Sequence, residues 1–177
     1  MFINPKKAIQ DGWIRGIKDP DNQIQPNAID FTADKAFSVN PNEDFYVSER
    51  TKKRRGGELV EPYPTYYETE PTMSWIIPSR DMFDFLSDIY VDLPEGVAAQ
   101  LVIRSTLARN GLLLTSGLYD SGFKGHIGFL LHNLHHSEAV IAQGTRVGQI
   151  IFVSTDKAGL YSGGYNHDHG TDLEYQG

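Results

Sequence analysis

SGLYDSGFKGHIGFLLHN, residues 116–133, is the stretch from which we predict how this chain folds. Three glycines allow the backbone to bend tightly around Asp120. From Gly125 onward the side chains alternate, so that Ile127, Phe129 and Leu131 share one face of an extended strand. The stretch therefore predicts a tight turn that leads into a half-buried strand. A carboxylate on such a rigid turn is suited to activating a water.

Further short apolar or alternating runs surround this strand, separated by Gly, Pro, Asn or His-Ser breaks. The runs that we expect to be strands are 28–31, 66–67, 75–77, 97–103, 111–115, 125–133, 139–142 and 147–153. Short strands at such close intervals are typical of an all-β sandwich or barrel. For residues 79–86 we expect instead a short capped helical turn.

The remaining segments predict one helix and two irregular regions within a single domain, residues 1–177. Asn4 can cap a helix whose first turn holds Pro5, and its apolar stripe predicts a helix within residues 1–18 that ends near residue 16. Residues 40–64 are rich in Pro, Asn and charge, which predicts an irregular insertion, and their basic run at 50–55 is typical of a solvated loop. Residues 159–177 are expected to form a flexible C-terminal lid.

Composition excludes several functions. The chain has 177 residues, of which 40% are hydrophobic, enough for one domain with a sizeable core. A net charge of -7 disfavours binding of a nucleic-acid backbone, although a small phosphorylated ligand needs only a local basic pocket. There is no cysteine, which removes disulfides, thiolate catalysis and cysteine-bound zinc. No stretch resembles a membrane span or a signal peptide, so we expect a soluble, cytoplasmic protein without membrane partners.

Four motifs, in order and spanning nearly the whole chain, resemble those of the dUTPase and dCTP deaminase superfamily. They are QPNAID at 25–30, RSTLAR at 104–109, GLYDSGFKGHI at 117–127 and GTRVGQ at 144–149. The closing LEYQ at 173–176 resembles the tail of the deaminase branch, without its lysine. The resemblance implies a distorted jelly-roll, or β-clip, with a short N-terminal helix. It also implies a homotrimer with sites at subunit interfaces.

The chemistry of these motifs suits a nucleoside triphosphate. Hydrolysis between its first and second phosphates needs donors that neutralise charge, a positioned water and a reader of the base. If Ser105 opens a short helix, its hydroxyl and the neighbouring Arg104 can face a phosphate, although an Arg-Ser pair can also cap a turn. Asp120 can orient or deprotonate the attacking water.

The resemblance assigns further roles to individual residues. It implies that Asp120 is the catalytic residue, and that Gln149 contacts phosphate or the base edge. Phe123 either packs on the deoxyribose or is a core aromatic, and Asp30 is either a strand-end aspartate or lies near magnesium that is bound mainly through the triphosphate. The residues expected to bind the substrate are Arg104, Ser105, Thr106, Arg109, Thr115, Ser116, Gly117, Phe123, Gln149, Tyr175 and Gln176.

One departure from the family pattern decides the expected reaction. The deaminase branch carries a proton-shuttling glutamate at the position of Leu130, and a leucine cannot carry a proton. We therefore expect a dUTP diphosphatase that produces dUMP and pyrophosphate. The alternatives are a dCTP deaminase or dCTP hydrolase with an altered site, and a non-catalytic nucleotide-sensing or protein-binding homologue.

Overall fold

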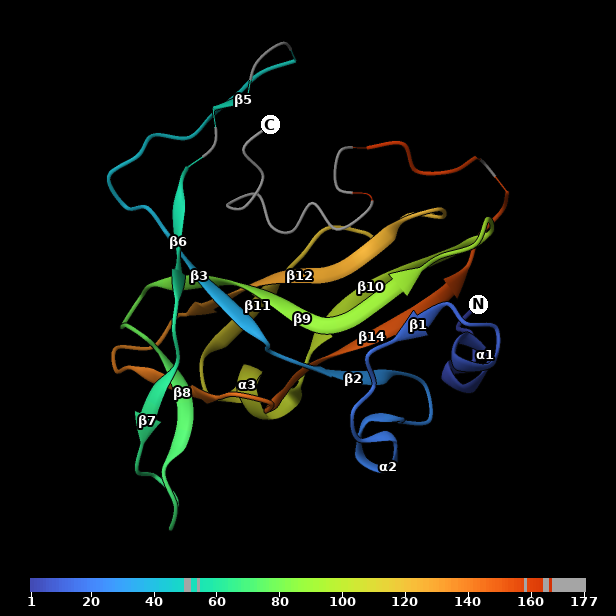
Figure 1. Cartoon of the computed structure of the whole chain (residues 1–177). Helices are drawn as coiled ribbons and strands as arrows, with labels where there is room; N and C mark the ends of the chain where they lie inside the picture. Colours follow the sequence, from blue (N-terminus) through green and yellow to red (C-terminus); the bar gives the residue numbers. More distant parts are fainter. Residues whose placement is uncertain (50–51, 54, 158, 164–165, 167–177) are drawn as a thin grey trace.

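Strands dominate the fold, as the sequence predicts. The computed structural model describes residues 1–49, 52–53, 55–157, 159–163 and 166 (Figure 1). The helices are α1 (Pro5–Gln10), α2 (Pro20–Gln23) and α3 (Ser105–Arg109). The strands are β1 (Ile14–Arg15), β2 (Ile29–Thr32), β3 (Lys35–Val39), β4 (Tyr46–Val47), β5 (Lys52–Lys53), β6 (Gly57–Val60), β7 (Tyr63–Thr65), β8 (Thr72–Ile77), β9 (Met82–Asp92), β10 (Val97–Ile103), β11 (Leu112–Thr115), β12 (Lys124–Asn133), β13 (Ala139–Ala142) and β14 (Arg146–Ser154).

The largest sheet is built around β12 and β9. Its order is β11-β12-β9-β3-β6, and β1 adds to β9. Along β12, burial alternates as expected, because Ile127, Phe129 and Leu131 are each at most 1% exposed while the side chains between them are less buried. The period-2 pattern therefore identifies the core-facing side of this strand correctly.

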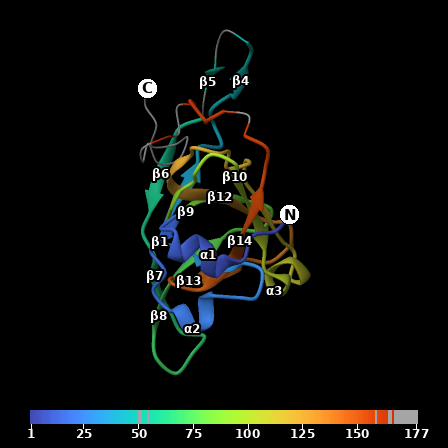
Figure 2. The same ribbon diagram turned by 90° about the vertical axis from the view of Figure 1, so that its right-hand side faces the viewer.

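A second sheet, with the order β10-β14-β2, packs against the first. Figures 1 and 2 show the strands of the two sheets at the centre of the molecule. Phe31 on β2 lies 5.0 Å from Phe129 on β12, measured between ring centroids, and Phe85 on β9 stacks on Phe129 at 5.7 Å. These aromatic contacts join the two sheets across one core. A third sheet, β13-β8-β7, and the β4–β5 hairpin complete the described strands.

The N-terminal helix is shorter than predicted. Asn4 caps α1 by accepting a hydrogen bond from the backbone of Lys6, as expected, but the helix ends at Gln10. Gly12 and Gly16 then take positive φ angles of 74° and 92°, and the chain between them forms β1 against β9. A side chain at residue 16 would lie 2.1 Å from the carbonyl oxygen of Asp88, so this approach requires glycine. Among the described residues, no helix has the length and apolar character needed to cross a bilayer.

Three segments differ from the expectations. The helical turn predicted for residues 79–86 is wrong, because β9 pairs with β12 on one edge and with β3 on the other, and ladder bonds on both edges outweigh local preference. Tyr66 and Tyr67 are not strand residues; they lie in the β7–β8 connection and are 78% and 80% exposed. The expected irregular insertion at 40–64 contains β4 to β7, of which β6 and β7 extend two of the sheets.

Candidate functional site

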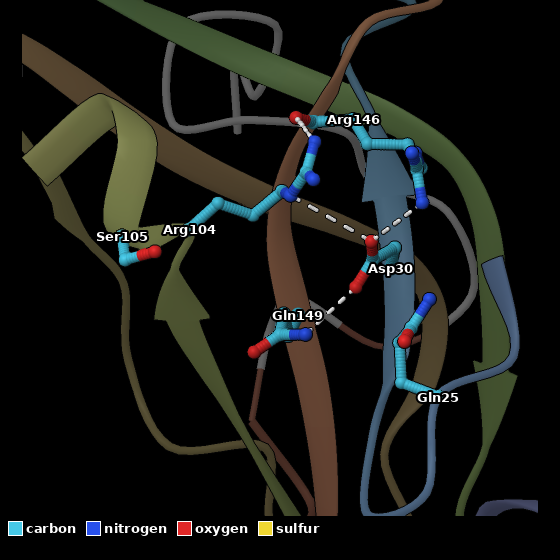
Figure 3. Close-up of a pocket in the computed structure, with 6 residues that line it drawn as sticks. All are labelled: Gln25, Asp30, Arg104, Ser105, Arg146 and Gln149. Carbon is cyan, nitrogen blue, oxygen red and sulfur yellow. Dashed lines mark hydrogen bonds and ion pairs between the residues drawn. The ribbon is translucent and has the colours of Figure 1, made fainter. Parts of the chain in front are cut away.

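A polar pocket lies on the β10-β14-β2 sheet, where β10 passes into α3. Its volume is about 330 Å³. Six residues line it, and Figure 3 shows their side chains converging on one region: Gln25, Asp30, Arg104, Ser105, Arg146 and Gln149. Four of these, Asp30, Arg104, Ser105 and Gln149, are predicted site residues. Motifs that are far apart in the sequence are therefore brought together here.

Asp30 is the centre of the pocket's hydrogen-bond network. It lies on β2 and is 2% exposed. The Nε2 of Gln149 donates to its Oδ1 at 2.8 Å, and the Nη1 of Arg146 donates to its Oδ2 at 3.2 Å. The Nε of Arg104 lies 3.7 Å from the same Oδ2 (Figure 3). Both carboxylate oxygens are therefore occupied by donors, and the buried negative charge is paired.

A β-bulge places Arg146 and Gln149 on the same face. In β14, Arg146 pairs with Thr32 and Gln149 pairs with Asp30, with a register shift between residues 146 and 148. Residues three apart in a regular strand point to opposite faces, so without the extra residue one of the two side chains would face the core. The bulge restores a common face, and both side chains reach Asp30.

Arg104 and Ser105 enter the pocket from the end of β10. Ser105 opens α3, as the sequence predicts, and Arg104 is the residue before it. The Nη1 of Arg104 donates to the carbonyl oxygen of Arg146 at 3.1 Å, which fixes the side chain across the pocket. The side chains of Arg104 and Arg146 are each 31% exposed, so parts of both guanidinium groups remain accessible. Two guanidinium groups and a hydroxyl form a donor set suited to phosphate oxygens.

The same donor set does not fit a divalent cation. Magnesium prefers oxygen ligands in an octahedral arrangement, but both oxygens of Asp30 already accept hydrogen bonds from positively charged or amide groups. Within the part of the chain that the structure describes, no group of three or more His, Cys, Asp or Glu side chains could hold a metal. The contacts of Asp30 are those of a residue that orients donors.

Two of the predicted phosphate-binding residues face a different hollow. Thr106 and Arg109 lie further along α3 and line a space of about 640 Å³ between α3 and β13, which Glu138 also borders. Neither residue lines the pocket around Asp30. The residues of the RSTLAR motif therefore line two different spaces: Arg104 and Ser105 face the pocket around Asp30, and Thr106 and Arg109 face the space beside β13.

Asp120 lies outside the pocket in the same protomer. It is exposed, and its carbonyl oxygen accepts a turn bond from the backbone of Phe123 at 3.0 Å. The preceding Tyr119 forms a bridge with Ala99 on the edge of β10 that faces away from β14. Arg104 is five residues further along that strand, roughly 16 Å at the usual rise per residue. Within this chain the Asp120 carboxylate therefore lies away from the pocket around Asp30.

The residues around Asp120 divide into exposed and buried groups. Thr115, Ser116 and Gly117 are exposed, and the hydroxyl of Thr115 lies 3.0 Å from the Nε2 of His132. Phe123 is 7% exposed and belongs to the core, with its ring centroid 5.0 Å from that of Tyr119. In this chain Phe123 therefore packs as a core aromatic, which is one of the two interpretations of this residue.

Tyr119 ties the turn to β12. Its hydroxyl donates to the carbonyl oxygen of Gly128 at 2.7 Å and accepts from the backbone N–H of the same residue at 2.9 Å. Burial raises the pKa of the Tyr119 hydroxyl, and the charge of Asp84 raises it further.

Asp84 is 8% exposed and pairs in register with Leu130, so the two side chains lie side by side on the same sheet face.

The segment expected to form a C-terminal lid falls largely outside the described residues, and so do Tyr175 and Gln176. The part that is described begins by packing on the turn that carries Asp120. The backbone N–H of Tyr161 donates to the carbonyl oxygen of Ser121 at 2.7 Å, and that of Lys124 donates to the Oδ1 of Asn166 at 2.9 Å. The described part of this C-terminal segment is therefore hydrogen-bonded to the turn that carries Asp120.

Sequence reasoning did not select Arg146 and Gln25 as site residues. Both lie inside motifs that resemble the family, GTRVGQ and QPNAID. The sequence does not reveal the bulge that brings Arg146 to the pocket. Strict alternation along the strand places residues 146 and 149 on opposite faces.

Comparisons with known proteins agree with the fold and the motifs. Residues 5–155 match the family model described as dCTP deaminase-like. A probable deoxyuridine 5'-triphosphate nucleotidohydrolase from Halobacterium salinarum is 31% identical over 148 residues, which cover 84% of this chain and 86% of the relative. A protein named dCTP deaminase, dUMP-forming, from Bifidobacterium animalis subsp. lactis is 31% identical over 134 residues, 75% of this chain and 66% of the relative.

A solved structure supports the fold. The 2'-deoxycytidine 5'-triphosphate deaminase from Agrobacterium tumefaciens superposes with a TM-score of 0.62 and 12% sequence identity, covering 85% of this chain and 46% of the solved chain. This chain therefore spans about half the length of that protein. At this identity the similarity concerns the fold alone.

Proposed function

Because the chain belongs to the dCTP deaminase-like family, we propose that it is a dUTP diphosphatase, which hydrolyses dUTP to dUMP and pyrophosphate. One observation carries most weight: the pocket brings together donors that suit phosphate oxygens, from Arg104, Ser105 and Arg146. Leu130, by the family resemblance, takes the position of the proton-carrying glutamate of a deaminase. The relative from Halobacterium salinarum, with a name of the same activity, supports this choice.

In the proposed reaction, Arg104, Arg146 and Ser105 bind phosphate oxygens and neutralise their charge. Asp120 takes a proton from a water, whose oxygen forms a bond to the innermost phosphorus. The bond from that phosphorus to the bridging oxygen breaks, and pyrophosphate leaves with the electron pair. Magnesium would be held mainly by the triphosphate, where it would neutralise charge, since the pocket offers no set of cation ligands.

The separation of Asp120 from the pocket supports a site that is shared between two protomers. The turn that carries Asp120 contacts the outer edge of β10 through Tyr119, whereas the pocket lies beyond the end of the same strand. We therefore propose that Asp120 of one protomer completes the pocket of its neighbour, in the homotrimer that the family resemblance implies. The backbone of residues 115–120 would then read the uracil of the nucleotide bound by the neighbour.

A second candidate function keeps dCTP as the substrate. Asp84 is buried and lies directly across the strand from Leu130, so a carboxylate is present beside the position of the missing glutamate. Through Asp84 the chain could move the protons that deamination needs, and the relative from Bifidobacterium carries the name of a dCTP deaminase.

The two functions give different products. The protein is incubated separately with dUTP and dCTP, and pyrophosphate and the base of the product are measured. Pyrophosphate from dUTP alone supports the diphosphatase; a uracil product from dCTP that disappears in Asp84→Asn supports the second candidate. If neither nucleotide is consumed, both functions are refuted.

Asp120→Asn tests the catalytic residue. We expect turnover of dUTP to fall by about 10²- to 10⁴-fold, because an amide cannot accept the water proton. Binding of a dUTP analogue with a nitrogen bridge between its first two phosphates should stay close to wild type, measured by calorimetry. Retained turnover would remove Asp120 from this role.

Mixing two inactive variants tests whether the site is shared. Asp120→Asn and Arg104→Met, co-expressed with different tags, should form mixed trimers in which about one third of the sites combine an intact pocket with an intact Asp120 from the neighbour. Activity near that fraction of wild type is expected, while each variant alone stays inactive. No recovery in purified mixed oligomers would show that the site is not shared.

A further inference from the structure

We propose that Asp30 is a positioning residue that fixes the orientation of the Gln149 amide, so that its carbonyl oxygen accepts a hydrogen bond from an O–H group beside the phosphates. This inference rests on the proposed function, because it concerns the same pocket. It replaces the roles expected from the resemblance: Asp30 near a metal, and Gln149 in contact with phosphate or the base edge.

The orientation of the amide follows from the chemistry of its partner. A carboxylate can only accept hydrogen bonds, so the group of Gln149 that lies 2.8 Å from Asp30 must be the amide nitrogen. The carbonyl oxygen of Gln149 then points away from Asp30, as Figure 3 shows. Arg146 and Arg104 lie at the other carboxylate oxygen, at 3.2 and 3.7 Å, and hold the carboxylate in place.

The Gln149 carbonyl oxygen is an acceptor in a pocket whose other contributions are mainly donors. Arg104 and Arg146 present N–H groups, and Ser105 presents a hydroxyl. These groups suit phosphate oxygens. The carbonyl oxygen does not, because two acceptors placed together repel each other. It therefore requires a donor that lies next to the phosphates.

Two O–H groups of the proposed reaction meet this requirement: the attacking water and the 3'-hydroxyl of the deoxyribose. A water that donates one proton to Gln149 and the other to Asp120 of the neighbouring protomer keeps a lone pair for the phosphorus, which is the arrangement an in-line attack needs. The sugar hydroxyl would instead fix the nucleotide. Both sources share the chemistry of an O–H donor.

Burial of Asp30 makes the hydrogen bond between Asp30 and Gln149 rigid. Asp30 is 2% exposed, and β2 and β14 carry Asp30 and Gln149 as a register pair. The side chain of Gln149 therefore cannot exchange its partner with bulk water without breaking a bond to a buried carboxylate. Because the Gln149 carbonyl oxygen is fixed as an acceptor, a hydroxyl or a water binds favourably beside it, whereas a phosphate oxygen at the same position does not.

Asp30→Asn tests this orientation directly. The asparagine can still accept from Arg146 through its oxygen, but its amide nitrogen then faces Gln149, which must rotate and turn its own NH₂ group into the pocket. We expect kcat for dUTP to fall by about 10- to 100-fold with KM unchanged or lower. The magnesium concentration that gives half-maximal rate should not change, whereas it would rise if Asp30 served a metal.

The matched control is Asp88→Asn. Asp88 is also a partly buried carboxylate beside β2, where it accepts from the hydroxyl of Thr32 at 3.0 Å and pairs with Lys18 at 2.7 Å, but it lies outside the pocket. We expect this variant to lose stability while kcat stays at the wild-type value. Equal losses of kcat in both variants would show a general effect of packing and overturn the proposal.

A double variant tests whether Asp30 acts through Gln149. In a Gln149→Ala background, Asp30→Asn should reduce kcat no further, because the group that it orients is absent. Losses that multiply would overturn the proposal. Repeating the comparison with 2',3'-dideoxyuridine triphosphate identifies the donor: the effect of Asp30→Asn persists if the donor is water and vanishes if it is the 3'-hydroxyl.

Side-chain NMR tests the orientation of the Gln149 amide independently of whether the protein hydrolyses a nucleotide. The NH₂ signal of ¹⁵N-labelled Gln149, assigned by its loss in Gln149→Ala, is followed while inorganic triphosphate is added. In the wild type it should shift little, and in Asp30→Asn it should shift strongly. If the wild type hydrolyses no nucleotide, the function fails but this readout still stands; equal shifts in both proteins would overturn the orientation itself.

Discussion

Replacing Gly148 with alanine tests whether core packing fixes the position of the pocket. Gly148 lies in β14 next to Gln149 and pairs with Phe31 of β2. An added Cβ atom would lie 2.2 Å from the Cζ and 2.7 Å from the Cε1 of the Phe31 ring. That ring is fully buried and already rests on Phe129 at a centroid distance of 5.0 Å. It has no free space to move into.

The expected magnitude follows from the overlap. Ordinary contacts of a Cβ atom begin at 3.4 Å, so either the ring or the strand must move by about 1 Å. Overpacking of a well-filled core costs about 1–3 kcal/mol, and a fully buried aromatic ring places this case near 3 kcal/mol. For a chain of this length the melting temperature should fall by roughly 6–12 °C. A displaced β14 would also separate Gln149 from Asp30 and reduce turnover.

Urea and thermal unfolding measure the loss, and Gly128→Ala is the matched control. Gly128 also lies within a strand of the core, but there an added Cβ atom would meet the Cδ2 of Leu86 at 3.6 Å and the carbonyl oxygen of Phe85 at 3.8 Å. These are ordinary contact distances. We therefore expect Gly128→Ala to change the free energy of unfolding by less than about 1 kcal/mol.

A second change checks the cause. Phe31→Leu in the Gly148→Ala background removes the ring carbons that the new methyl group meets, so part of the lost stability should return. Wild-type stability of Gly148→Ala, or an equal loss in Gly128→Ala, would refute the packing argument.

Two further predictions concern stability. Tyr119→Phe removes the hydroxyl that satisfies both the N–H and the carbonyl of Gly128 at 2.9 and 2.7 Å, so unfolding in urea should show a loss of about 2–4 kcal/mol; a loss below about 0.5 kcal/mol would mean that water replaces both bonds. The hydrogen bond with Asp88 raises the pKa of Lys18 above its usual 10.5. The Lys18–Asp88 pair therefore contributes fully to the free energy of unfolding below pH 10.5, and this contribution is lost as the pH rises through the raised pKa. The loss of stability at alkaline pH should be smaller in Lys18→Met than in the wild type. Identical pH profiles of unfolding for the two proteins would contradict this.

The strands that the sequence predicts correctly are those whose partners impose a simple pattern. β10, β11, β12, β13 and β14 lie within one residue of the expected runs, because each is either half-buried with period 2 or short and apolar between turns. β9 was expected to begin as a helical turn because Ser79 to Asp84 contain a capping pattern. Its real determinant is pairing on both edges, which a local pattern does not contain.

The candidate site could be predicted in composition but not in arrangement. Asp30, Arg104, Ser105 and Gln149 gather in one pocket, as the motifs indicate. Which side of each strand faces the pocket depends on the bulge before residue 148, and neither residue spacing nor charge reveals a bulge. The separation of Asp120 from the pocket is likewise a property of sheet order, because it follows from which edge of β10 the turn contacts.

The two sheets divide the proposed reaction between them. The proposed phosphate donors belong to the β10-β14-β2 sheet and the start of α3, whereas Leu130 and Asp84 belong to the β11-β12-β9 sheet. Substitutions at residue 130 should therefore change the chemistry at the base while leaving triphosphate affinity intact, since no contact between Leu130 and the pocket is needed to hold the arginines. The same separation allows proteins of one fold, with similar phosphate motifs, to differ in whether the amino group of cytosine, the triphosphate, or both are hydrolysed.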